Sequence, residues 1–338
     1  MSDIRAFIRR LPKAELHLHL EGTILPPTLV ELSKRHDARP MTLAQAKALY
    51  RFDDFSSFIE SFKAVTRRLI TPEDYELAAW RMMQHLAKQG VVHAEVYISV
   101  GVIYMWRNFD PRALEPIFSA LEEARKRAER ELGISLYWIF DAVRHFTVEE
   151  AERVFRKAAA LRSEFPSIIG IGLGGDERRT GSEPFRALYA EASRAGLRLT
   201  NHAGETTGPE AIWEALDIGS ERLGHALSAI QDEALIAELK RRNVVLELNP
   251  TSNVRTGVCA SFSDHPLRKY FDAGLLVTLN SDDPAFFGSD VANEYLLAHT
   301  QQKFTREELR HLAANSIRAS FLPELAKTAW LTRIASAS

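Results

Sequence analysis

Polar and apolar residues alternate from Glu15 to Gly22, the period of a strand with two different faces. His17 and His19 therefore face the same way, and the leucines around them face the other way. Further runs rich in apolar residues recur along the chain, and helical stretches separate most of them. We expect seven strands in addition to the first, at residues 91–100, 134–143, 168–173, 197–202, 222–225, 244–248 and 275–279.

Helix start signals stand between these strands. Thr71 followed by Pro72 is a typical N-cap and first helical position, and Thr147 opens a capping-box-like sequence. Eight strands with helical crossovers predict a parallel (β/α)8 barrel, the TIM barrel fold. No linker rich in Pro, Gly or Ser divides the chain, so we expect residues 1–338 to form one domain. Residues 40–90 or so would be a helical insertion after the first strand.

Composition narrows the choice of partners and compartment. Of 338 residues, 46% are apolar and 26% are charged, as in soluble globular proteins, and the net charge of −2 predicts no attraction to nucleic acid or anionic membranes. Cys259 is the single cysteine, which favours a reducing compartment. The N-terminal residues lack the apolar core of a signal peptide, and no stretch approaches a membrane span. We therefore expect a cytoplasmic protein that binds neither nucleic acid nor membrane; the oligomeric state is left open.

The residues that could take part in catalysis or metal binding lie at the C-terminal strand ends, where a barrel enzyme carries its active site. His17 and His19 share one face of the first strand, and neutral imidazoles suit zinc and related divalent ions. His202, after the fifth strand, is a third candidate ligand. One of Asp282 and Asp283, after the eighth strand, can complete the ligand set while the other faces the substrate.

Three histidines and one aspartate leave a coordination position open for water, whose pKa a bound metal lowers towards ~7. Glu205 lies too far along its loop to be an obvious ligand and suits a general acid, with His225 or Asp282 as the base. Singly, His225 could be a hydrogen-bonded core histidine and the aspartate pair a helix cap. Together these residues predict a hydrolase.

Five motifs occur in the order of a known family, and the match extends over nearly the whole chain. On these motifs the chain resembles the adenosine deaminase family of metal-dependent amidohydrolase barrels. They are His-Leu-His-Leu-Glu-Gly at 17–22, Gly-Gly-Asp-Glu at 174–177, His-Ala-Gly-Glu at 202–205, Leu-Gly-His at 223–225 and Asn-Ser-Asp-Asp-Pro at 280–284. The other zinc deaminase architecture needs several cysteines, and this chain has one.

The resemblance implies hydrolytic deamination at C6 of a 6-aminopurine nucleoside, with release of ammonia and the 6-oxopurine. In such a reaction Glu205 protonates purine N1 and His225 orients or deprotonates the attacking water. The catalytic residues implied are Glu205, His225 and Asp282. One Zn²⁺ per chain would be bound by His17, His19, His202 and Asp282.

The resemblance also implies a set of substrate contacts. They involve His19, Glu21, the backbone at Gly175, Asp283 and Arg144, which stands with His145 in a pair that recurs in the family.

Departures from the family pattern bear on the substrate. Classical adenosine deaminases carry an aspartate at the position of Glu21, where it meets the ribose 5′-hydroxyl. The longer glutamate resembles the adenine and 6-aminodeoxyfutalosine branches, and residues 99–103 and 251–257 look closer to the second of these. Residues 172–177 read Gly-Leu-Gly-Gly-Asp-Glu, where family members often have Asp-Leu-Ala-Gly-Asp-Glu. The substrate of that branch carries a carboxylate, which an arginine could bind. The candidates are Arg178, Arg179 and Arg255.

The leading expectation is therefore deamination of adenosine or a derivative such as 6-aminodeoxyfutalosine. Free adenine is the alternative substrate. A non-catalytic purine-binding or metal-binding barrel is a third interpretation, disfavoured because acid, base and four ligands are all present. The ligands alone leave the identity of the divalent ion open.

Overall fold

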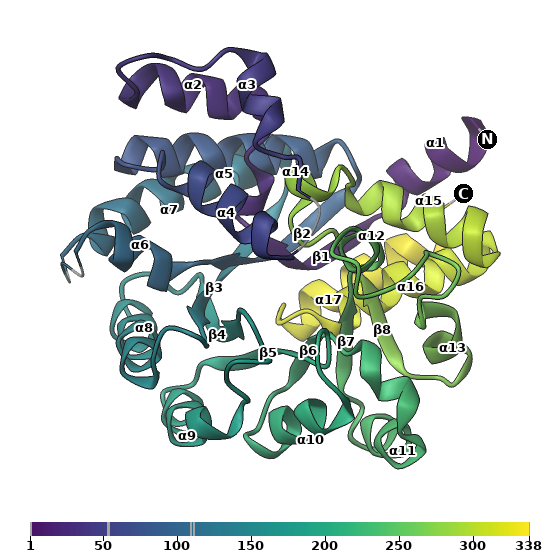
Figure 1. Ribbon diagram of the computed structural model, residues 1–338. Helices are drawn as coiled ribbons and strands as arrows, with labels where there is room; N and C mark the ends of the chain where they lie inside the picture. Colours follow the sequence, from purple (N-terminus) through teal and green to yellow (C-terminus); the bar gives the residue numbers. More distant parts are fainter. Residues whose placement is uncertain (1, 53–54, 109, 111, 338) are drawn as a thin grey trace.

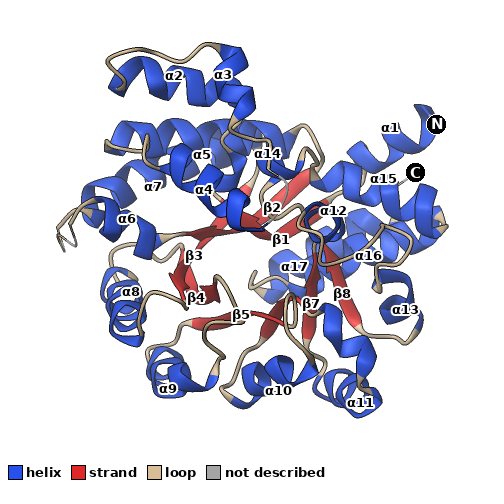
Figure 2. Ribbon diagram, viewed as in Figure 1, coloured by secondary structure: helices blue, strands red, loops and turns tan. Residues whose placement is uncertain are grey.

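The computed structural model describes residues 2–52, 55–108, 110 and 112–337. Eight strands occupy the middle of the molecule and helices surround them (Figures 1 and 2). Neighbouring strands pair in parallel and in chain order. The strands are β1 (Lys13–His19), β2 (Val91–Ile98), β3 (Ser135–Val143), β4 (Ile168–Gly174), β5 (Arg198–Ala203), β6 (Arg222–His225), β7 (Val245–Leu248) and β8 (Leu276–Leu279).

The sheet closes on itself between β1 and the residues that follow β8. Leu18 and Asp282 form a parallel bridge. The amide of His19 donates to the carbonyl of Asp282 at 3.0 Å, and the amide of Asp282 donates to the carbonyl of His17 at 3.1 Å. The (β/α)8 barrel expected from the sequence is confirmed, and its closure brings the ends of β1 and β8 together.

The helices form the outer layer of the barrel. Four of them, with a short 3₁₀ turn, lie between β1 and β2, which confirms the helical insertion, and α2 and α3 are the part farthest from the strands in Figure 1. The helices are α1 (Ser2–Arg10), α2 (Pro26–His36), α3 (Leu43–Ala48), α4 (Phe55–Thr66), α5 (Pro72–Ala87), α6 (Val100–Trp106), α7 (Leu114–Leu132), α8 (Val148–Leu161), α9 (Arg186–Arg194), α10 (Pro209–Asp217), α11 (Glu233–Arg242), α12 (Pro250–Arg255), α13 (Leu267–Asp272), α14 (Pro284–Phe287), α15 (Val291–Gln302), α16 (Arg306–Ala319) and α17 (Glu324–Ala335).

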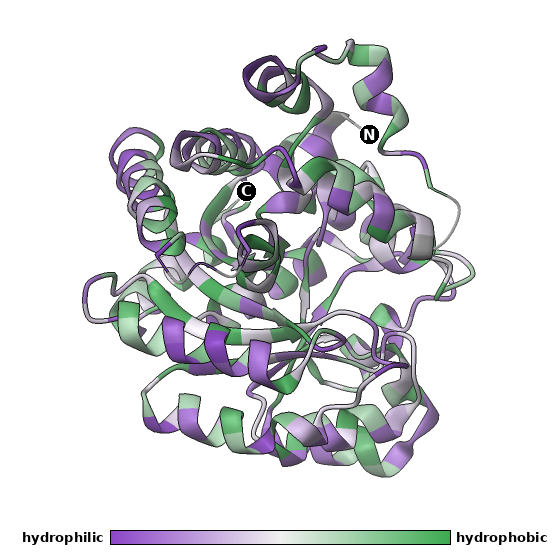
Figure 3. Cartoon of the chain, turned by 60° about the vertical axis from the view of Figure 1, so that its left-hand side comes forward, coloured by the Kyte–Doolittle hydropathy of each residue, from purple (hydrophilic) through white to green (hydrophobic). Residues whose placement is uncertain are grey.

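The core lies between strands and helices. On β3, Trp138 and Phe140 are fully buried and pack against Phe118 of α7, with ring centroids 6.3 and 5.3 Å apart. The outer helices carry both hydrophilic and hydrophobic residues along one ribbon (Figure 3), as expected where one face of a helix packs on the sheet. No helix in the described ranges is both long and apolar enough to cross a membrane.

Some boundaries differ from expectation. β1 ends at His19, because Leu20 has helical dihedral angles (φ −52°, ψ −48°) and begins a 3₁₀ turn, Glu21–Thr23. β2 ends at Ile98, and α6 begins where the strand was expected to continue. The N-cap at Thr71 and the cap at Thr147, whose side chain accepts from the amide of Glu150, are both present.

Candidate active site

A cavity opens at the C-terminal ends of the strands. Its polar lining comes from the strand ends, and most of its apolar lining comes from α4, α6 and the loops after β3 and β8. The polar residues include His19, Asp141, Gly174, Gly175, His202, Glu205, His225, Ser252, Asp282 and Asp283. The apolar residues are Phe58, Ile59, Phe62, Val102, Met105, Val143, Phe146 and Phe287.

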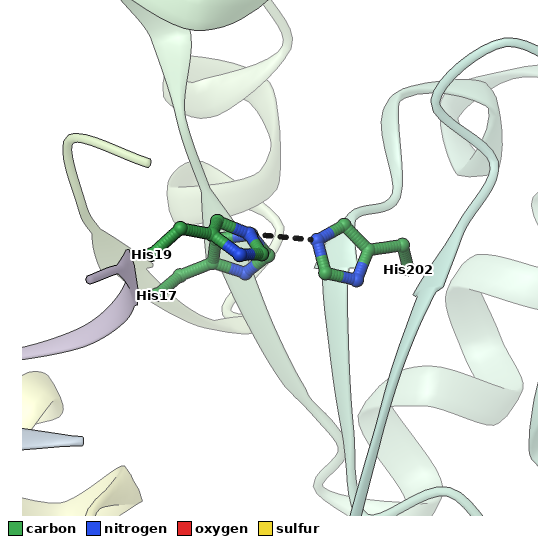
Figure 4. Close-up of side chains that lie close together, drawn as sticks. All are labelled: His17, His19 and His202. Atoms are coloured by element: carbon green, nitrogen blue, oxygen red, sulfur yellow. Dashed lines mark hydrogen bonds between the residues drawn. The ribbon is translucent and has the colours of Figure 1, made fainter. Parts of the chain in front are cut away.

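Three imidazoles and one carboxylate converge here. His17 and His19 extend from the same face of β1, and His202 reaches them from β5 (Figure 4). Nε2 of His19 lies 3.3 Å from Nε2 of His202. Oδ1 of Asp282 lies 3.5 Å from Nε2 of His17 and 3.4 Å from Nε2 of His19. The structure thus brings together all four residues singled out as ligands from the sequence.

The spacing and chemistry of these atoms fit a bound divalent ion. Ligand bonds of ~2.0–2.2 Å in a tetrahedral zinc site place neighbouring ligand atoms about 3.3–3.5 Å apart. Nε2 of His17 is buried and has no hydrogen-bond partner within the described part of the chain. Three imidazole nitrogens, one of them buried without a partner, lie beside a carboxylate oxygen. These four atoms make a donor set that suits zinc. The residues present therefore fit the metal.

Hydrogen bonds on the far side of two imidazoles fix which nitrogen faces the cluster. Nδ1 of His17 lies 2.8 Å from Oε2 of Glu247, whose other oxygen lies 2.6 Å from Nε of Arg222. Nδ1 of His202 donates to the carbonyl of Leu173 at 3.2 Å. Because an outward Nδ1–H leaves Nε2 with its lone pair, both rings are held in the tautomer that binds a metal.

Burial sets the charge of the cluster. It lowers the pKa of His19 to about 3 and that of His202 well below the usual value, so both rings are neutral. Burial opposes ionisation of Asp282, but the imidazole of His17, 3.5 Å away, holds its pKa well below the usual range through its charge. Burial likewise disfavours a charged His17, yet Asp282 and Glu247 raise its pKa to about 10. A metal ion at this nitrogen would therefore compete with a proton on His17.

A second group of polar side chains borders the cluster. Burial, with a smaller contribution from the charge of Asp282, raises the pKa of Glu205 to about 8, so its carboxyl holds a proton at neutral pH. Nδ1 of His225 lies 3.8 Å from Oε1 of Glu205, and its Nε2 lies 4.0 Å from Oδ2 of Asp282. Ser252 donates to that same Oδ2 at 2.7 Å. Burial and the charge of Asp282 also raise the pKa of Asp283 well above its usual value.

A chain of hydrogen bonds fixes the tautomer of His225. The amide of Leu267 can only donate, and it lies 3.2 Å from Nδ1 of His265. Nε2 of His265 therefore carries the hydrogen that Oδ1 of Asn253 accepts at 3.2 Å. The amide nitrogen of Asn253 then donates to Nδ1 of His225 at 2.9 Å. This order leaves the hydrogen of a neutral His225 on Nε2, the nitrogen nearer Asp282.

Two further features hold the site residues in place. Glu177 accepts from the amides of Gly204 and Glu205 at 2.8 and 2.9 Å, and so shapes the turn that carries Glu205. Asp282 and His225 both adopt left-handed backbone conformations, with φ of 64° and 65°. Such conformations cost energy for residues other than glycine and are concentrated at functional sites.

Two residues expected to contact the substrate are buried beside the cavity and do not line it. Oε1 of Glu21 accepts from the amide of Ser99 at 3.1 Å, at the start of α6, and Ser99 does line the cavity. The guanidinium of Arg144 donates to Oδ1 of Asn201 at 3.0 Å and to the carbonyl of His202 at 2.5 Å. In this structure Glu21 and Arg144 hold segments that border the cavity, and their contact with a substrate stays a prediction.

The three arginines considered as carboxylate ligands also lie away from the cavity lining. Arg178 and Arg179 are exposed, with Nε atoms 3.1 and 3.8 Å from the carboxylate of Asp176, and Arg255 is not among the lining residues. Among the described residues, Lys63 of α4 is the one lysine or arginine that lines the cavity. Nothing in the pattern of α4 distinguishes Lys63 from a solvated surface lysine.

Sequence reasoning also missed Glu247, Asp141 and Asn253. Glu247 stands in Val-Leu-Glu-Leu and Asp141 in Ile-Phe-Asp-Ala-Val, and both are buried. A carboxylate inside an apolar strand is costly unless it is paired or functional, and this was the available signal. Asn253 lies on α12 and carried no such signal.

Comparisons with known proteins agree with this geometry. The family profile for adenosine deaminase matches residues 12–337. An aminodeoxyfutalosine deaminase of Streptomyces avermitilis is 40% identical over 328 residues, covering 96% of this chain and 90% of that protein. An adenine deaminase of Rhodospirillum rubrum is 36% identical over 341 residues, covering 98% of each.

Solved structures give the same result. An adenine deaminase from Arthrobacter aurescens superimposes with a TM-score of 0.89 at 32% identity, covering 96% of this chain and 98% of that one. An amidohydrolase from Burkholderia ambifaria, solved with bound Zn, has a TM-score of 0.89 at 27% identity, covering 98% and 91%. The chain belongs to the adenosine deaminase family.

Proposed function

We propose that this protein is a zinc-dependent deaminase that hydrolyses the C6–amino bond of a 6-aminopurine nucleoside, releasing ammonia and the 6-oxopurine. The observation that carries the proposal is the convergence of three imidazoles and Asp282 beside the protonated carboxyl of Glu205 in one cavity. The deaminases among its relatives support the reaction type, and the relative solved with Zn supports the metal.

The ligand set in this proposal is His17, His19, His202 and Asp282, holding one Zn²⁺ per chain. When bound by these residues, Zn²⁺ would lower the pKa of a water molecule towards neutrality. The protein contributes the correct tautomers of His17 and His202, through Glu247 and the carbonyl of Leu173.

Glu205 is the general acid of the proposed reaction. Its raised pKa keeps a proton on the carboxyl at neutral pH, available for purine N1 as negative charge develops there. Asp283, also protonated by burial, hydrogen-bonds the purine ring, and the backbone at Gly175 meets its far edge. These contacts direct C6 towards the ligand cluster.

His225 orients the attacking water as a hydrogen-bond donor. The sequence alone does not decide whether His225 or Asp282 is the general base. With Nδ1 occupied by Asn253, the Nε2 of His225 holds a hydrogen and has no lone pair to accept another. The carboxylate of Asp282, whose Oδ2 faces His225, can instead accept the proton of the attacking water. We therefore assign the base role to Asp282.

The apolar part of the cavity lining supports a nucleoside derivative as the substrate. It includes Phe58, Phe62, Val102 and Met105, and Lys63 is the cation in the lining among the described residues. Such a wall suits an apolar group at the ribose 5′ position, and Lys63, which pairs with Glu60 at 2.8 Å, is available to a negative charge there. Free adenine is the second candidate, supported by the adenine deaminases of R. rubrum and A. aurescens.

A substrate panel with elemental analysis tests the proposal. Purified protein should contain about one divalent ion per chain, and ultraviolet absorbance should report turnover of adenosine, deoxyadenosine, 5′-deoxy and 5′-thio analogues, aminodeoxyfutalosine or adenine. Active protein without metal, or full activity in His17→Ala or His202→Ala, contradicts the metal assignment. Turnover of adenine alone supports the second candidate, and purine binding without any turnover contradicts both.

A further inference from the structure

Asp141 is a buried carboxyl in the cavity that the proposed reaction does not use. It lies near the end of β3, with 4% of its surface exposed, and it lines the cavity together with Gly174 and His202. Its Oδ1 has no hydrogen-bond partner among the residues that the structure describes. A buried carboxyl oxygen without a partner is costly, and the residue that carries it lines the cavity.

The neighbouring strand leaves room for this carboxyl. A Cβ atom at Gly172 of β4 would lie 2.7 Å from Oδ1 of Asp141 and 2.7 Å from the ring of Tyr97. A Cβ atom at Gly174 would lie 3.0 Å from Oδ2 of Asp141. The two distances at Gly172 are too short for a real contact, and the one at Gly174 is tighter than nearly all real ones, so glycine on β4 leaves room for an aspartate on β3. The carboxyl therefore occupies a slot that two strands form.

We propose that Asp141 is a specificity-determining residue, whose carboxyl accepts a hydrogen bond from a donor at the N9 end of the substrate. The inference rests on the proposed function and goes beyond it by naming a contact on the non-reacting part of the substrate. In either charge state a carboxyl keeps an oxygen that can accept.

The chemistry of a 6-aminopurine identifies this donor by elimination. The amino group at C6 reacts at the ligand cluster, N1 takes a proton from Glu205, and ring atoms N3 and N7 carry no hydrogen in the nucleoside. The remaining N–H or O–H donors are all attached at or through N9: the N9–H of free adenine, or a hydroxyl of the sugar. One acceptor can thus serve either substrate candidate, and an experiment can tell which it serves.

A cycle that removes the acceptor and the donor in turn tests the contact. Asp141→Ala removes the acceptor, and Asp141→Asn keeps one carbonyl oxygen in a side chain of the same shape. Each is assayed on adenosine against its 2′-, 3′- and 5′-deoxy analogues, and on adenine against 9-methyladenine. Glu122→Gln is the matched control, because Glu122 is a buried carboxyl of α7, outside the barrel, that accepts from the indole of Trp138 at 3.0 Å.

We expect Asp141→Ala to lose about 5- to 150-fold in kcat/KM on the substrate that carries the donor, and less than about threefold on the analogue that lacks it. Asp141→Asn should lose less than Asp141→Ala, and metal content should be unchanged in both. A loss confined to adenine identifies N9–H, and a loss confined to one hydroxyl pair identifies that hydroxyl. An equal loss on every substrate overturns the proposal, because it indicates a structural role.

Binding separates this inference from the proposed reaction. If the wild type turns over none of these purines, the deaminase proposal fails. Calorimetric binding of hypoxanthine and inosine, the 6-oxopurine counterparts, then tests Asp141 independently. Weaker binding of one of them to Asp141→Ala than to the wild type supports the contact. Equal binding, or no binding to either protein, overturns it.

Discussion

Glu247 and His17 form a hydrogen bond of 2.8 Å between Oε2 and Nδ1, both fully buried inside the barrel. The carboxylate holds the imidazole with Nε2 turned towards Asp282, 3.5 Å away. Glu247 is itself held by Arg222, which also pairs with Glu95. A series of alternating charges therefore runs through the barrel interior and ends at the ligand cluster, which links the packing of the strands to the geometry of the site.

Glu247→Gln should weaken metal binding about 10- to 100-fold, the usual effect of changing the outer partner of a metal-binding histidine. A neutral amide accepts the Nδ1–H of His17 less strongly than a carboxylate does. Chelator competition on the purified protein measures the change. Glu122→Gln is the control. It changes a buried carboxyl whose hydrogen-bond partners do not contact His17, and it should bind metal as the wild type does. Unchanged affinity in Glu247→Gln contradicts this role.

Glu205→Gln should keep its metal and lose turnover. An amide cannot deliver a proton to a ring nitrogen, and general acids of this kind contribute ~10²–10⁴-fold. The carboxyl is held by a turn whose amides bond to Glu177, so the substitution leaves the loop intact. Elemental analysis and kcat measure the two outcomes separately. Loss of metal, or a decrease in rate of less than about tenfold, means that Glu205 has another role.

Asn253→Asp should reverse the tautomer of His225. A carboxylate has no hydrogen to donate, so Nδ1 of His225 must carry one and Nε2 becomes an acceptor. We expect the ¹⁵N resonances of the imidazole to exchange their protonated and unprotonated signatures, and kcat to decrease at least ~10-fold. Asn293→Asp on α15 is the control. Finding Nδ1–H on His225 in the wild type contradicts the hydrogen-bond order described here.

The fold could be predicted because its signals are local. Alternation in β1, apolar runs in the later strands, and the caps at Thr71 and Thr147 each depend on neighbours in sequence. The ligands followed, because barrel closure brings the ends of β1, β5 and β8 to one point. Predicting β2 as far as residue 100 was wrong, since the start of α6 depends on Glu21, far away in the chain, accepting from the amide of Ser99.

Other parts of the site depend on long-range contacts that no local pattern contains. The partner of Glu247 is 230 residues away in sequence, and Asn253 has its role only because α12 and the loop before α13 meet beside His225. Arg144 was expected to contact the substrate, on the basis of a recurring motif. Its side chain spans β3 and β5, a use that a motif cannot reveal. Local patterns thus predict which residues reach the site better than what holds them there.

The last prediction concerns Glu21 and the ribose 5′ position. Oε1 of Glu21 holds the amide of Ser99 at 3.1 Å, while Oε2 is buried without a partner among the described residues. An aspartate is one methylene shorter, so Glu21→Asp should release Ser99 and open space near the 5′ carbon. The substitution should therefore move preference towards adenosine. The measurement is the kcat/KM ratio of adenosine to 5′-deoxyadenosine and to aminodeoxyfutalosine, with Glu122→Asp as the control.

The wild-type ratio decides whether Glu21 shapes the pocket in this way. A pocket that hydrogen-bonds a hydroxyl rejects analogues lacking it by ~10⁴–10⁵-fold, whereas a pocket without that demand discriminates only ~10–200-fold. The apolar lining, with Phe58 and Phe62 on α4, offers a 5′-hydroxyl little to bond with. We therefore expect the wild type to tolerate bulky or acidic 5′ groups, with a ratio in the lower range. A ratio above ~10³ in favour of adenosine would establish the 5′-hydroxyl as a recognised group and make this a plain adenosine deaminase.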